Sequence, residues 1–201
     1  MSKPETTATK QTRSERVAHW NNVFVKEFGR ESDRAAVIVA ASIFDSSLDS
    51  LLRQYLVPCS SSNDDLFDGT NAPLSTFSAK IAMAHRLGLI TTKFCRNLHL
   101  IRRIRNEFAH NIHGGSFEDT AVKARVRELN KGQIYEEPDS DIRRDLPPGP
   151  RGDFLCVCLW MLWCLSAITE KTRPLSEPDL EFGFVFTTKD AGTSDSKNKA
   201  D

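Results

Sequence analysis

Three residues that lie close together in the sequence could act on a phosphodiester, namely Arg105, Asn106 and His110. A histidine can exchange protons near neutral pH. An arginine can hold phosphate oxygens and stabilise the charge that develops on them. The candidate catalytic residues are therefore Arg105, Asn106 and His110, and the helix that positions them decides whether they can act together.

Residues 92–113 are predicted to form that helix, with two stripes at helical spacing. The segment contains five lysine and arginine residues and one acidic residue, Glu107, so its local charge is +4. Arg102, Arg103 and His113 are the candidate binding residues on it. One stripe consists of Leu98, Ile101, Arg105, Phe108 and Ile112, and the other of His99, Arg103, Asn106, His110 and His113.

Two interpretations of Arg105 are open from the residues alone. In the first, Arg105 lies in a core-facing row and pairs with Asp45 or Asp49, because an unpaired buried charge is very costly. His110 is then a histidine favoured by the dipole at the helix end. In the second, the three candidates form a site. Arg105 lies roughly 140° from His110 around an unbroken helix, so that site needs a second chain or a kink.

The remaining helices are predicted from apolar spacing and from capping residues. A helix over 16–28 stops at Gly29, and a long helix begins at Ser32 and ends before Pro58. The first half of that long helix is apolar nearly all round, which predicts the central helix of the core. A loop over 58–73 and a helix over 75–87 follow.

The second half of the chain is predicted to continue as helices around one polar excursion. Ser116 is expected to open a helix, and residues 131–152, with four prolines, to form a surface excursion. Asp153 is expected to cap the last long helix. A short strand or extended arm is possible over 174–186.

These elements predict an all-α fold, a compact bundle of mostly antiparallel helices with flexible termini. The expected organisation is a disordered tail over 1–13, one helical domain over 14–188 and a second disordered tail over 189–201.

Composition limits the possible functions of this chain of 201 residues. Basic and acidic residues both number 27, so the net charge is zero, which argues against a free-standing duplex-DNA binder. The five cysteines are expected to be free thiols, with neither a metal nor another cofactor.

The most apolar run, 154–167, is too short to span a bilayer, which needs about 20 residues. We therefore expect a cytoplasmic protein with no membrane segment.

Three stretches of the sequence resemble the mannitol operon repressor (MltR/MtlR) family. They are LFDGTNAPLSTFSAKIAMAHRLGLI, then LHLIRRIRNEFAH, then a Gly-Gly break before SFED. The resemblance covers about residues 30–170. It implies a compact all-helical fold and a transcriptional regulator without a recognisable DNA-reading motif of its own.

The arginine, the polar residue after it and the histidine also resemble the HEPN superfamily motif, Arg-x4-His. Many proteins of this superfamily are metal-independent ribonucleases that place two such motifs at a dimer interface. The resemblance implies that His110 is the acid/base, Arg105 holds the phosphate and Asn106 supports them.

Two functions therefore follow as expectations. The first is a non-enzymatic regulator of the mannitol operon repressor type that acts through a protein partner, either a DNA-binding regulator or a second copy of itself. The alternative is a HEPN-type ribonuclease built from Arg105, Asn106 and His110, so whether the chain is an enzyme is open. A homodimer is expected in either case, and RNA is a possible ligand.

Overall fold

The computed structural model describes residues 28, 31–111, 115–131 and 145–177. Its helices are α2 (Asp33–Tyr55), α3 (Phe77–Arg86), α4 (Thr92–His110), α5 (Thr120–Asn130) and α7 (Pro150–Lys171). The described residues contain no strand, so the all-α class is confirmed. The expected helix over 16–28 and the arm over 174–186 lie mostly outside these residues, although Phe28 is helical and buried.

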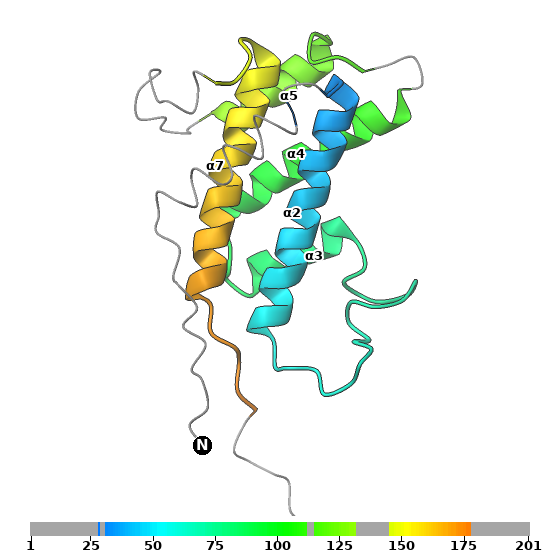
Figure 1. Cartoon of the computed structure of the whole chain (residues 1–201), viewed down its shortest axis with the longest axis vertical. Helices are drawn as coiled ribbons and strands as arrows, with labels where there is room; N and C mark the ends of the chain where they lie inside the picture. Colours follow the sequence, from blue (N-terminus) through cyan, green and yellow to red (C-terminus); the bar gives the residue numbers. More distant parts are fainter. Residues whose placement is uncertain (1–27, 29–30, 112–114, 132–144, 178–201) are drawn as a thin grey trace, which may run out of the picture.

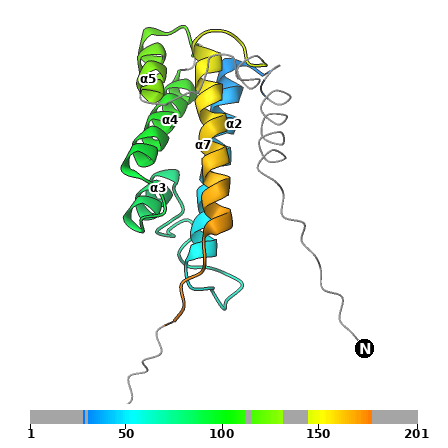
Figure 2. The same ribbon diagram turned by 90° about the vertical axis from the view of Figure 1, so that its left-hand side faces the viewer.

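The helices form two layers. The long helices α2 and α7 lie side by side, and α3, α4 and α5 cover one side of this pair (Figures 1 and 2). Helix α2 contacts α3, α4 and α7, which confirms it as the central helix of the core. Its buried side chains are Ala36, Val37, Ala40, Ala41, Phe44, Leu48, Leu51 and Leu52.

The directions of the helices differ in part from the antiparallel expectation. Arg151 at the start of α7 binds Asp33 at the start of α2, with Nη1 2.8 Å from Oδ1. Gln54 at the end of α2 donates to the carbonyl of Thr169 near the end of α7. The two long helices are therefore parallel. Helix α4 crosses α2 obliquely, and its end lies beside the start of α2 (Figure 1).

Capping residues explain where most helices begin. The side chains of Ser32 and Thr91 accept hydrogen bonds from backbone N–H groups in the first turns of α2 and α4, as expected. The expected start of α5 at Ser116 is wrong, because the N-cap is Asp119. The expected cap of α7 at Asp153 is also wrong. Pro150 occupies its first turn, where a missing N–H costs nothing.

Helix α7 is longer than the apolar run that predicted it. With 22 residues, it is long and apolar enough to span a bilayer by length and composition, as is α2 with 23. About half of the most apolar stretch of each helix is buried within the fold, 56% in α7 and 44% in α2. Core helices of water-soluble proteins have the same properties, so length and composition do not identify a membrane protein here.

Candidate functional site

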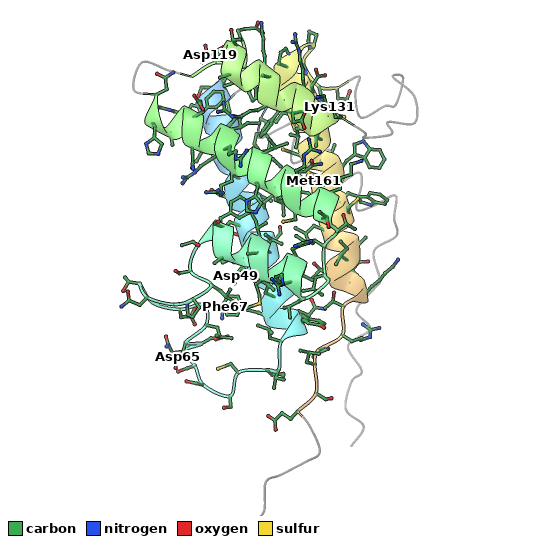
Figure 3. The ribbon with its side chains drawn as sticks, turned by 180° about the vertical axis from the view of Figure 1, so that it is seen from behind. Asp49, Asp65, Phe67, Asp119, Lys131 and Met161 are labelled. Atoms are coloured by element: carbon green, nitrogen blue, oxygen red, sulfur yellow. The ribbon has the colours of Figure 1, made fainter. Side chains whose placement is uncertain are left out.

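The outward side of α4 presents most of the candidate residues, and we call Arg102, Arg103, Arg105, Asn106 and His110 the α4 face. Arg103, Arg105 and His110 are exposed, and Arg102 and Asn106 are half-buried. Figure 3 looks onto the side of the molecule formed by α4 and α5, with Asp119 and Lys131 marking the two ends of α5. His113 lies outside the described residues.

Arg105 does not occupy the core position that the sequence pattern gave it. Ile104 is fully buried in its place, between Ile101 and Phe108. Residues 104 and 105 both satisfy helical spacing between these two neighbours, and the apolar side chain is buried because burying an unpaired guanidinium costs far more. Leu98, Ile101 and Phe108 of the expected stripe are buried as predicted, and Ile112 lies outside the described residues.

The first of the two interpretations, an ion pair of Arg105 with Asp45 or Asp49, is wrong, because Lys80 of α3 binds both carboxylates. Its Nζ lies 2.9 Å from Asp45 Oδ1 and 3.0 Å from Asp49 Oδ1. Burial alone would raise the pKa of Asp49, but hydrogen bonds from Arg53 and Lys80 hold it below its ordinary value. Both carboxylates thus have a cation without Arg105.

We expect Arg105→Ala to change the free energy of unfolding by no more than about 0.5 kcal/mol, as is usual for an exposed side chain. Lys80→Met is the contrasting variant, because it leaves Asp45 without its cation and Asp49 with Arg53 alone, at a cost of about 1–3 kcal/mol. Urea unfolding of both variants tests this. A larger loss of unfolding free energy for Arg105→Ala than for Lys80→Met would support the interpretation in which Arg105 is part of the core.

Two of the three candidate catalytic residues share a surface hollow of about 480 Å³. Asn106 and His110 line it from α4, and Arg125 lines it from α5. Arg125 Nη1 lies 2.9 Å from Glu107 Oε2, an ion pair that joins the two helices here. The hollow is also lined by Arg103, Glu107 and Asn111.

Arg105 lies on the other side of Asn106. Its Nη1 donates to Asn106 Oδ1 over 3.2 Å. It lines a second hollow together with Arg102, whereas His110 does not. One chain therefore brings Asn106 to both arginine and histidine but does not bring Arg105 and His110 into one hollow, in agreement with the angle expected for an unbroken helix.

A third hollow, of about 520 Å³, lies between α4 and α5 and is lined by His99, Arg102 and Arg103, among others. Burial lowers the pKa of His99, and the positive charges of Arg102 and Arg103 lower it further. Arg96 pairs with Glu128 across the same hollow. At His99 the charges of these two arginines thus add to the larger effect of burial.

This shift predicts how stability depends on pH. The unfolded chain binds a proton at His99 more readily than the folded chain does. The free energy of unfolding should therefore fall as the pH drops below the ordinary value of 6.5 and through the lower pKa of the folded state. His99→Gln should flatten this dependence in urea titrations between neutral and mildly acidic pH. An equal slope in both proteins would contradict the assignment.

Sequence reasoning missed the residue that holds the end of α4. Arg34 of α2 donates from Nε to the Phe108 carbonyl over 2.9 Å and from Nη2 to the Asn111 carbonyl over 2.6 Å. Carbonyls at a helix end lack partners within the helix, so this arginine fixes the turn that presents His110. The sequence predicts that Arg34 lies in the first turn of α2. No local pattern indicates that it binds the Phe108 carbonyl, 74 residues away.

The described residues contain no group of three histidine, cysteine or acidic side chains that could hold a metal ion. The five cysteines, all within the described ranges, are free thiols, as expected. Burial raises the pKa of the Cys158 thiol well above its ordinary value, so this group stays protonated within the core.

No family model matches the sequence, and no curated protein matches it. The fold does match a solved structure, a chain in the X-ray structure of the MtlR–HPr complex from Escherichia coli. The match has a TM-score of 0.53 at 18% sequence identity, and it covers 75% of this chain and 99% of the other. The chain thus has a mannitol-repressor-like fold.

Proposed function

We propose that this chain is a non-enzymatic regulator of the mannitol operon repressor type that acts through a protein partner in the cytoplasm. The observation that supports this most is the fold, which matches nearly the whole length of a chain whose solved structure is the MtlR–HPr complex. A protein partner is also favoured by the zero net charge. The expected lack of a DNA-reading motif favours it as well.

The α4 face is the surface we propose for that partner. Three of its members are arginines, and none of them forms an ion pair with an acidic side chain among the residues that the structure describes. Arginine is enriched in protein interfaces, and complementary charge guides the approach of a partner. The partner we propose therefore presents an acidic surface.

Charge reversal on the α4 face tests this proposal. Partners captured by cross-linking in cells would be purified and titrated against the wild type, Arg103→Glu and Arg173→Glu. Both arginines are exposed and the charge change is equal, but Arg173 follows α7 and is not part of the α4 face. Arg103→Glu should weaken binding by about tenfold or more, while Arg173→Glu should not. Equal affinity for all three proteins would place the partner elsewhere.

A second candidate function is a HEPN-type, metal-independent endoribonuclease. Two observations favour it. Arg105 is exposed, because Ile104 occupies the core position, and Asn106 and His110 line the same hollow. Because Arg105 lines a different hollow, this candidate requires a homodimer in which one copy supplies the arginine and its partner the histidine. Light scattering that finds only monomer at micromolar concentration would remove it.

A further inference from the structure

We propose that the second hollow, beside Arg105, is a binding site for the terminal phosphate of a small phosphomonoester or for free phosphate. The hollow has a volume of about 260 Å³. It lies where α2, α3 and α4 meet, and its lining residues are Ala41, Ser42, Asp45, Thr76, Phe77, Ser78, Arg102, Arg105 and Asn106. This site shares Arg102, Arg105 and Asn106 with the α4 face, but it needs neither His110 nor a second chain.

Two guanidinium groups in the hollow have no acidic partner among the described residues. Arg105 donates one hydrogen bond, to Asn106, and no other bond from its guanidinium is found within the described ranges. The Nε of Arg102 is shielded from solvent and has no hydrogen-bond partner in the described part of the chain. A buried donor without an acceptor is costly, and an anion in the hollow would offset the charge of this guanidinium.

The start of α3 supplies neutral donors on the opposite wall. The first backbone N–H groups of a helix have no partner within the helix. Thr76 accepts from the N–H of Ala79, but no bond to the N–H of Phe77 or Ser78 is found in the described residues. The first turn of α3 contains no acidic residue, so nothing there already neutralises the positive end of the helix dipole.

The other polar residues do not oppose an anion. The Ser42 hydroxyl donates to the Ile38 carbonyl over 2.9 Å, so it is not a donor for the ligand. Asp45 is the acidic residue in the lining, and Lys80 lies 2.9 Å from its carboxylate. The two arginines therefore leave a net positive charge in the hollow. Paired guanidinium groups beside a helix start fit a phosphate, whose oxygens accept several charge-assisted hydrogen bonds.

The phosphate is assigned to a small molecule because the hollow is small and is bounded by three helices. Phe77 contributes an apolar wall on which the carbon part of a phosphomonoester could lie. Inorganic phosphate and glycerol phosphate present the same terminal group, and comparing them shows whether this apolar wall contributes to binding.

The test is a titration of the full-length, ¹⁵N-labelled protein with sodium phosphate, compared with sodium chloride at equal ionic strength. Phosphate should shift the amide signals of Phe77 and Ser78 saturably. The double variant Arg102→Gln/Arg105→Gln should weaken binding by about tenfold or more, because two charge-assisted hydrogen-bond donors are lost. Arg86→Gln is the matched control, since Arg86 is an exposed arginine at the end of α3 that neither lines this hollow nor belongs to the α4 face.

A second variant keeps the test decisive if the double variant folds poorly. Ser78→Asp places a negative charge in the first turn of α3, which favours the helix and repels the ligand. It should retain or raise the melting temperature and abolish the phosphate-dependent shifts. Tighter binding of glycerol phosphate would identify an organic ligand, and equal binding would identify free phosphate. The site is wrong if no saturable shift occurs, if both variants bind as the wild type does, or if only RNA oligonucleotides bind.

Discussion

Phe108→Ala should lower the free energy of unfolding by about 3–5 kcal/mol, the cost typical of emptying a fully buried phenylalanine site. Phe108 lies within the Arg-x4-His motif but has no exposed surface. Its ring centroid lies 5.3 Å from that of Phe117, which in turn lies 5.3 Å from that of Phe154. These three aromatic rings connect α4, the turn before α5 and α7.

The surroundings of Phe108 leave little room for the cavity to collapse. Gly115 packs so closely that an added Cβ would lie 2.9 Å from Phe108 Cδ1. The backbone at Phe108 is fixed by Arg34, which binds its carbonyl. Urea unfolding measures the loss, and Phe108→Leu is the control. Leucine keeps most of the apolar volume, so that variant should lose only about 1–2 kcal/mol. A loss below about 1 kcal/mol for Phe108→Ala would contradict this packing.

The positions of the helices could be predicted from the sequence because the signals are local. Ser32 and Thr91 are capping residues directly before apolar runs, and Gly88, with a φ of +72°, lies in the turn just after α3. Glycine adopts this left-handed conformation without the steric cost that a Cβ imposes. Such features act within one turn of helix, and the sequence contains them in full.

The side of α4 that faces the core could not be decided from spacing alone. Ile104 and Arg105 both fit between Ile101 and Phe108, and the choice between them depends on which side chain the core accepts. The interpretation that put Arg105 in the core needed a partner on α2. In the structure, Lys80 binds Asp45 and Asp49, and that contact depends on how α3 packs against α2.

The candidate site depends most on contacts between distant segments. Nothing in the sequence distinguishes Arg34 and Arg151 from other arginines. In the structure, Arg34 binds the end of α4, and Arg151 joins the starts of α2 and α7. The hollow beside Arg105 draws its lining from three helices. No periodicity or motif in one segment predicts such a hollow, because its residues come together only when the three helices pack.

If the ribonuclease candidate is correct, His110→Ala should lower the rate of RNA cleavage by about 10²–10⁴, the usual effect of losing a general acid or base. His110 would help to activate a 2′-hydroxyl or protonate the leaving oxygen, so no metal is required. A chelator should not inhibit, and a substrate with a 2′-deoxy group at the cut position should be inert. Arg105→Ala should also lose activity, because the phosphate charge would no longer be stabilised.

The fold should survive these substitutions, since His110 and Arg105 are exposed and Arg34 holds the end of α4 without them. Cleavage of labelled single-stranded RNAs of varied sequence is the measurement, with Arg86→Ala as a control that removes an exposed arginine outside the α4 face. Mixing Arg105→Ala with His110→Ala should restore part of the activity if the site forms between two copies, because one of the two sites in the mixed dimer keeps both groups. A wild-type dimer that leaves every RNA intact would show that the Arg-x4-His motif does not cleave RNA here. The α4 face would then be a binding surface only.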